Sequence, residues 1–182
     1  LAMDCALNIM ESGINVALFS IDMNKEEVDA RLIANRARVD VQHILQNNLT
    51  PDEIKKIDTS KSKLKMYGEL FIDDRSYRMS ELAYKAKKLV KEQNVQCLLF
   101  DYLQLIDDDR YRGNNRVLEI GIVMRRLKQL SKELNVPIIP ISQLSRKSED
   151  RGKSEREPRL SDLRDSGAIE QDADVVIFVY RE

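Results

Sequence analysis

The sequence contains little cysteine, little histidine and almost no net charge, and each shortage excludes a class of protein. Only two of the 182 residues are cysteines and one is a histidine. Cys5 and Cys97 lie far apart, a spacing that indicates neither a disulfide framework nor a metal-binding motif. A His-rich metal site or a Ser-His-Asp triad would depend on His43 alone. Thirty basic and 31 acidic side chains leave a formal charge of −1, which excludes a globally basic coat for nucleic acid but not a local basic patch.

Sequence features of other classes are also missing. No apolar run reaches the roughly 18 residues that a membrane-spanning helix needs. Neither Gly-x-x-x-x-Gly-Lys-Ser/Thr nor Gly-x-Gly-x-x-Gly occurs, so these residues hold no phosphate-binding loop of either type. We find no signal peptide and expect a cytoplasmic protein. Helical spacing starts at Leu1 without a capping residue, and an apolar run almost reaches Glu182. We therefore expect a piece of a longer protein, with functional residues missing at both ends.

The residues that are present predict a folded α/β domain. Apolar residues make up 42 % of the chain and charged residues 34 %, which is typical of a domain with a buried core. Short runs of consecutive apolar residues predict strands buried on both faces, as in a parallel sheet, and helical patterns separate them. The predicted fold is a mostly parallel sheet flanked by helices. The predicted strands are Val16–Ile21, Leu70–Ile72, Val95–Phe100, Pro137–Ile141 and Val175–Tyr180, and the predicted helices are about Lys25–Ala37, Pro51–Met66, Ser80–Glu92 and Val117–Leu134.

Local signals mark where three of these helices begin. Thr50 is a good capping residue because a proline follows it at the first helical position and acidic residues occupy the first turn. Ser80 and Asn115 are plausible caps for two later helices. His43, which has no partner at metal-ligand spacing, is interpreted as a surface or packing residue. The two cysteines lie in apolar patterns and are interpreted as core residues.

Two polar segments fit neither pattern, and both directly follow a predicted strand. They are the stretch from Asp107 to Asn114 and the stretch from Leu144 to Asp165. Ligands of open α/β sheets bind beyond the carboxyl ends of strands, so long loops there are often functional, or disordered. The second segment has almost balanced charge and no aromatic residue. We interpret it as a solvated face, whose contacts with nucleic acid would go to phosphates rather than stacked bases.

Three polar side chains follow predicted strands and are candidates for nucleotide chemistry. Asp101 ends a buried strand, where a carboxylate is costly unless a cation lies on it, as in the Mg²⁺ sites of nucleoside triphosphatases. Asp22 follows another strand and would polarise an attacking water. Gln143 would donate to a γ-phosphate and report its loss. Each has a plainer alternative: a turn or capping aspartate for Asp101, a cap of the helix near Lys25 for Asp22, and an ordinary polar strand end for Gln143.

Taken together, five stretches resemble the bacterial and phage replicative DNA helicase family, DnaB, in its C-terminal motor domain. The resemblance covers essentially the whole chain and is strongest from Phe100 to Glu182. Its most specific part is the run from Asp162 to Asp174, and its least diagnostic part is the run from Arg38 to Met66. The stretches are Asp101–Leu105, Asn115–Ile120, Leu127–Pro137, Ser142–Arg146 and Leu160–Asp174.

The resemblance implies a RecA-like domain of a hexameric ring that uses ATP and Mg²⁺ to translocate 5′ to 3′ on single-stranded DNA. It implies that Asp101 directs the magnesium ion through a bound water and that Gln143 senses the γ-phosphate. Both polar segments would face the central channel. Arg164, Asp165 and Gly167 match positions that grip the DNA backbone, partly through main-chain N–H groups. Partners implied by the resemblance are a primase and a helicase loader.

Two departures from the family pattern affect the expected activity. The family reads Ser-Leu-Glu-Met after its second strand, and that glutamate activates the hydrolytic water, whereas this chain has Asp22 there. The shorter side chain shifts a carboxylate by about 1 Å, a misplacement that can cost on the order of 100-fold in rate. The second departure is truncation. The resemblance places the family's phosphate loop just before Leu1 and the basic residues that reach the neighbouring ATP site beyond Glu182, so residues 1–182 would be one incomplete motor domain.

Three further functions compete with an ATP-driven helicase. The first is a RecA-like ring that binds DNA or a partner protein but hydrolyses ATP weakly or not at all, because of Asp22. The second is a recombinase-type or clock-type RecA relative that does not unwind DNA, against which the run from Asp162 to Asp174 argues. The third is an α/β domain that binds no nucleotide, which the set of motifs makes the most distant.

Overall fold

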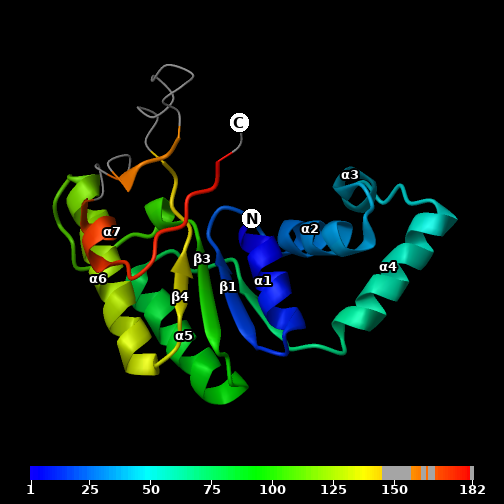
Figure 1. Cartoon of the computed structure of the whole chain (residues 1–182), viewed down its shortest axis with the longest axis horizontal. Helices are drawn as coiled ribbons and strands as arrows, with labels where there is room; N and C mark the ends of the chain where they lie inside the picture. Colours follow the sequence, from blue (N-terminus) through cyan, green and yellow to red (C-terminus); the bar gives the residue numbers. More distant parts are fainter. Residues whose placement is uncertain (145–156, 161–162, 164–166, 181–182) are drawn as a thin grey trace.

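A four-stranded parallel sheet with the strand order β2-β1-β3-β4 lies at the centre of the computed structural model (Figure 1). The structure describes residues 1–144, 157–160, 163 and 167–180. Its strands are β1 (Val16–Ser20), β2 (Leu70–Asp73), β3 (Cys97–Asp101) and β4 (Ile138–Pro140). The predicted parallel α/β fold is therefore confirmed, and its first four predicted strands are present.

The inner strands are buried on both faces, as their consecutive apolar residues predict. Every residue of β1 is buried, and so are the first four residues of β3. Phe19 and Phe100 are register partners on these strands, and their rings stack in parallel with centroids 4.7 Å apart. This stack lies one residue before the ends of the two strands, Ser20 and Asp101, and it fixes the spacing of the sheet there.

Two helical layers cover the sheet. The helices α5 (Met79–Gln93) and α6 (Arg116–Leu134) pack on one face, where Phe19 and Phe100 lie. The helices α1 (Ala2–Glu11) and α2 (Lys25–Ala37) pack on the other face, where Leu18 and Leu99 lie. The alternate side chains of each inner strand thus enter two different cores. Among the described residues, no helix has both the length and the apolar character needed to cross a membrane.

Two further helices extend away from the sheet beyond α2, as Figure 1 shows. These are α3 (Val41–Leu45) and α4 (Pro51–Leu64), which we call the arm. A small separate core of Ala37, Val39 and Ile57 joins the arm to the end of α2. The sequence did not predict α3, since five residues are too short for a helical pattern to be recognised. The remaining elements are the 3₁₀ helix η1 (Leu103–Leu105) and α7 (Gly167–Asp172).

The predicted helix starts are correct in two places and wrong in one. Thr50 and Glu53 form a reciprocal capping box, and the side chain of Asn115 accepts hydrogen bonds from the first turn of α6. Ser80 is not a cap, because the helix begins earlier, at Met79, after Arg78. The N–H of Ser80 is instead satisfied by the carboxylate of Asp109, at 3.1 Å.

The predicted strand from Val175 to Tyr180 is wrong. Within the described residues these six positions form no strand. The backbone is not paired with β4 or any other described strand, so the segment lacks the hydrogen bonds that define a sheet. Its side chains still alternate: Val176 and Phe178 pack on the core shared with α6, while Val175 and Ile177 are 75 % and 83 % exposed.

The cysteines and the histidine have structural surroundings. Cys97 is buried in β3, and Cys5 packs beside the same core. Burial, together with the nearby Cys5, raises the pKa of the Cys97 thiol to about 11, so this thiol is protonated and unreactive at neutral pH. His43 lies in the arm and pairs with Glu53 at 2.8 Å.

Candidate functional site at the carboxyl edge of the sheet

Asp22, Asp101 and Gln143 all follow strands at the same edge of the sheet. These strands, β1, β3 and β4, are parallel neighbours, so their carboxyl ends lie side by side. The chain continues this pairing past the strand ends. The N–H of Ile21 donates to the carbonyl of Asp101 at 2.9 Å, and the N–H of Ile141 donates to the carbonyl of Phe100 at 2.9 Å.

The turn that carries Asp22 is fixed by a buried serine. Ser20 is 2 % exposed, and its hydroxyl donates to the carbonyl of Met23 at 2.8 Å. Asp22 therefore lies at the tip of a closed turn, with its side chain exposed. It does not cap the following helix, because Asn24 caps α2 by accepting from the N–H of Glu27, at 2.9 Å. The plainer interpretation of Asp22 as a helix cap is therefore wrong.

Asp101 is a partly buried carboxylate without a hydrogen-bond or ion-pair partner among the described residues. Burial raises the pKa of this carboxyl. The positive amino group of Leu1 opposes the rise, and the negative charge of Asp22 adds to it. Two carboxylates and the start of α1 thus lie within electrostatic range of one another, an arrangement that a divalent cation would stabilise.

Asp73, at the corresponding end of β2, shows what a structural aspartate looks like in this fold. Its carboxylate accepts from the Lys85 ammonium at 2.6 Å and from the Ser76 N–H at 3.0 Å. Burial raises the pKa of Asp73, but these hydrogen bonds outweigh burial and leave the pKa below its ordinary value. The contrast with Asp101 is one of partners, since both carboxylates are partly buried at strand ends.

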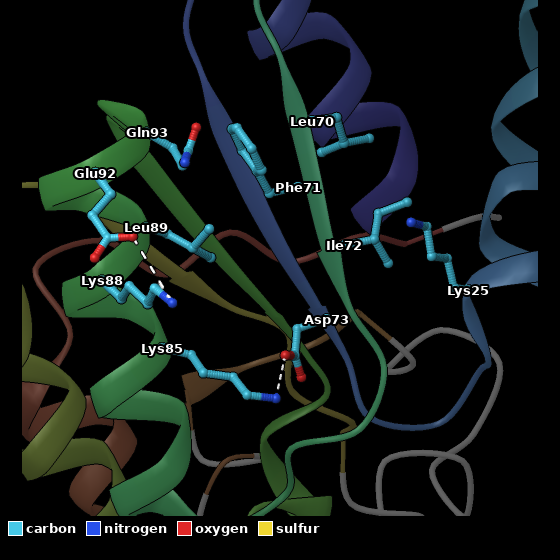
Figure 2. Close-up of a pocket in the computed structure, with 10 residues that line it drawn as sticks. All are labelled: Lys25, Leu70, Phe71, Ile72, Asp73, Lys85, Lys88, Leu89, Glu92 and Gln93. Carbon is cyan, nitrogen blue, oxygen red and sulfur yellow. Dashed lines mark hydrogen bonds and ion pairs between the residues drawn. The ribbon is translucent and has the colours of Figure 1, made fainter.

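A cavity of about 410 Å³ lies beside Asp73, between the edge strand β2 and the helix α5 (Figure 2). Two of its lysines are already paired: Lys85 with Asp73, and Lys88 with Glu92 at 3.9 Å. The cavity is lined by none of the three candidate residues at the carboxyl edge. We therefore do not assign the candidate site to this cavity.

Gln143 is held through its backbone rather than its side chain. Gln104, which sequence reasoning did not single out, donates to the Gln143 carbonyl at 3.3 Å and accepts from the Gln143 N–H at 3.2 Å. The Gln143 side chain is exposed. The signal that could have found Gln104 is its position, three residues after Asp101 in the Asp101–Leu105 stretch.

The predicted DNA-contacting residues are only partly described. Arg164 and Asp165 lie outside the described residues, as does most of the segment 144–165. Gly167 is the first residue of α7, which packs through Ile169 on the core shared with α6. The first polar segment, 107–114, is fully described and closely bonded to α6. Asp108 in this segment is 3 % exposed and pairs with Arg126 at 2.5 Å.

Comparisons with known proteins agree with this architecture. The chain is 39 % identical over its full length to a probable plasmid replicative DNA helicase of Chlamydia psittaci, and 37 % identical to the replicative DNA helicase DnaB of Geobacillus stearothermophilus. It spans only 39 % and 40 % of these two relatives.

Two solved structures have the same fold. One is an isolated ATPase domain, with a TM-score of 0.87, 29 % identity, and coverage of 99 % of this chain and 64 % of that one. The other is a DnaB-like replicative helicase described with its interactions with primase, with a TM-score of 0.85, 30 % identity, and coverage of 100 % and 43 %. The family model described as the DnaB-like helicase C terminal domain matches residues 1–182. The chain therefore belongs to the DnaB-like helicase C-terminal domain family.

Proposed function

We propose that residues 1–182 form part of a single RecA-like motor domain that hydrolyses ATP to drive a replicative DNA helicase. The observation that carries this proposal is Asp101, a partly buried carboxylate without a partner among the described residues, next to Asp22 at the carboxyl edge of a parallel sheet. A structural aspartate in the same sheet, Asp73, is paired with Lys85. Ligands of open parallel sheets bind at this edge.

The donors at this edge suit Mg²⁺ bound together with ATP. Proteins commonly hold this ion with one or two carboxylates, and water and substrate phosphates complete its coordination. In this proposal Asp101 holds the ion through water, and the ion would neutralise charge that develops on the phosphates. Asp22 takes part by orienting and polarising the attacking water, and Gln143 donates to the γ-phosphate.

The proposed partners follow from the family and from the resemblance of the sequence. We propose single-stranded DNA as the track, gripped by Arg164, Asp165 and Gly167, and a homo-hexameric ring as the assembly. Backbone N–H groups and arginine are suitable donors for DNA phosphates. A primase is a proposed partner because one solved relative is a DnaB-like helicase described with its interactions with primase. A helicase loader is proposed from the family resemblance.

The replacement Asp101→Asn in the complete protein tests the proposal. We expect ATP hydrolysis to fall by about 100-fold or more, because the amide cannot supply the negative charge that the metal ion requires. The matched control is Asp52→Asn, an exposed acid on α4, which should hydrolyse ATP at the wild-type rate. Wild-type hydrolysis by Asp101→Asn would contradict the proposal.

Melting curves separate lost chemistry from lost folding. Because folding raises the pKa of Asp101, its ionised form is disfavoured in the folded state at any pH above that raised value. Without Mg²⁺, Asp101→Asn should therefore melt slightly above the wild type at neutral pH. An inactive variant that melts well below the wild type would show damage to the fold instead.

The alternative, a DNA- or partner-binding ring with weak hydrolysis, is favoured by one observation, the aspartate at position 22. The replacement Asp22→Glu in the complete protein distinguishes the two functions. If Asp22 is correctly placed, the rate should stay within a few-fold of wild type, and Asp22→Asn should lose about 100-fold. A gain of about tenfold or more in Asp22→Glu would favour the weakly hydrolysing ring, since a misplaced carboxylate would have been corrected.

A further inference from the structure

Gln104 connects the end of β4 with the end of β3. It lies in η1, directly after β3, and its side-chain amide faces the segment that leaves β4. The amide Nε2 donates to the Ser142 hydroxyl at 2.8 Å and to the Gln143 carbonyl at 3.3 Å. The amide Oε1 accepts from the Gln143 N–H at 3.2 Å. One side chain therefore holds the backbone of Gln143 through both its donor and its acceptor.

The backbone of Gln104 is itself held by an arginine at the start of α6. The Nη2 of Arg116 donates to the carbonyl of Gln104 at 2.6 Å and to the carbonyl of Ile106 at 2.9 Å. The Nη1 of the same guanidinium donates to Asp107 at 3.0 Å and to Glu119 at 2.6 Å. Because the guanidinium is a planar fork, it fixes η1, the start of the 107–114 segment and α6 relative to one another.

The contacts continue into the 107–114 segment through Asp108. Glu119 accepts from the N–H of Asp108 at 3.0 Å, which joins Asp108 to the Arg116 group. The buried Asp108 carboxylate pairs with Arg126 at 2.5 Å and accepts from the N–H of Arg110 at 2.9 Å. A continuous series of hydrogen bonds thus leads from Gln143 to the 107–114 segment.

The tip of this segment is closed by Tyr111. The Tyr111 hydroxyl accepts from the N–H of Asn115, the cap of α6, at 3.0 Å. A Cβ atom at Gly113 would lie 2.3 Å from that hydroxyl oxygen, so any larger residue there would displace the tyrosine ring from this hydrogen bond. The segment is therefore a closed structure whose position depends on η1 and α6.

We propose that Gln104 is a positioning residue that couples Gln143 to the 107–114 segment, so that the state of the nucleotide sets the grip of this segment on single-stranded DNA. The inference rests on the proposed function, in which Gln143 contacts the γ-phosphate and the segment faces DNA. A movement of Gln143 changes its two hydrogen bonds with Gln104, and through Arg116 it displaces the segment. Packed hydrogen-bond networks of this kind change between discrete arrangements rather than stretching.

The test compares Gln104→Met with Gln129→Met in the complete protein. Methionine keeps the length of the side chain but removes the amide, and Gln129 is an exposed glutamine of α6 that serves as the matched control. The measurement is the affinity for a single-stranded oligonucleotide with Mg²⁺ and a non-hydrolysable ATP analogue, divided by the affinity with Mg²⁺ and ADP. We expect Gln104→Met to reduce this ratio by about tenfold, in the range of typical coupling energies, and Gln129→Met to preserve it.

Further readouts distinguish coupling from structural damage. Gln104→Met should bind a fluorescent ATP analogue within about twofold of wild type, because the nucleotide contacts remain in place. Gln104→Glu keeps the acceptor for the Gln143 N–H and should give an intermediate ratio. The proposal is overturned if Gln104→Met keeps the wild-type ratio, or if it weakens DNA binding equally with both nucleotides. A wild-type protein that binds DNA equally with both nucleotides would overturn the proposed function as well.

Discussion

The carboxyl edge of the sheet and the arm are held together by different kinds of interaction. At the edge, side chains far apart in the sequence converge, such as Gln104 with Ser142 and Arg126 with Asp108. In the arm, the main contacts join near neighbours, as in the capping box of Thr50 and Glu53. Precise placement of chemical groups thus depends on long-range packing, whereas local signals suffice to form a helix pair.

The largest expected difference between the two regions concerns core truncation. Leu99 is fully buried between two layers, so Leu99→Ala should reduce the free energy of unfolding by about 4 kcal/mol. Ile57 belongs to the small core of the arm, which can collapse around a cavity, so Ile57→Ala should cost about 2 kcal/mol. Urea denaturation of the chain, followed by circular dichroism, measures both. Equal costs would contradict the distinction, because the arm and the sheet would then form one equally packed unit.

A smaller effect is expected at the capping box of α4. The Thr50 hydroxyl accepts from the N–H of Glu53, and Glu53 accepts from the N–H of Thr50 at 2.8 Å. Thr50→Ala should lower the stability of the arm by about 1 kcal/mol. Thr59→Ala is the matched control, since the Thr59 hydroxyl only donates to the Lys55 carbonyl within the helix and its loss should be nearly neutral. Amide exchange in α4 is the measurement, and a larger loss for Thr59→Ala would refute the prediction.

The smallest effect is a pH dependence of the arm. The hydrogen bond with Glu53 and its negative charge raise the pKa of His43, and hydrogen bonds from Thr50 and His43 lower the pKa of Glu53 to about 2. The histidine therefore stabilises the arm fully below its ordinary pKa of 6.5, and this contribution is lost as the pH rises through the raised value. The glutamate contribution is complete above its ordinary pKa of 4.5 and is lost as the pH falls through about 2.

Amide exchange at pH 6 and pH 8 measures this dependence. Protection of α3 and α4, corrected for the intrinsic effect of pH, should fall slightly between the two values in the wild type. It should not change in His43→Gln, which cannot gain the charge, and β1 should show no difference between the proteins. A pH dependence that persists in His43→Gln would assign the effect to another group.

Much of the fold follows from local sequence, and the remainder depends on contacts that sequence patterns do not encode. The consecutive apolar residues of Val16–Ser20 and Cys97–Asp101 predict inner strands correctly, because burial on both faces leaves a clear pattern. The same pattern in Val175–Tyr180 predicts a strand wrongly, since strand formation also requires a neighbouring backbone.

For the candidate site, position along a strand was more informative than the kind of residue. Asp22, Asp101 and Gln143 could be placed at one sheet edge because the carboxyl ends of parallel strands meet there. Their proposed roles come from the family resemblance and stay predictions. Gln104 and Arg116 were missed because their function depends on partners 39 and 12 positions away in the sequence, and spacing alone does not show such pairs.

The stacked rings of Phe19 and Phe100 tie the durability of the protein to its chemistry. The two phenylalanines immediately precede Ser20 and Asp101, so any change that tilts one ring also shifts the turn before Asp22 or the neighbouring carboxylate. A displacement of about 1 Å can cost a reacting group on the order of 100-fold in rate. A genetic screen for inactive variants should therefore recover these two hydrophobic positions as readily as the polar ones, and mutational tolerance at this pair should be narrow even toward other apolar residues.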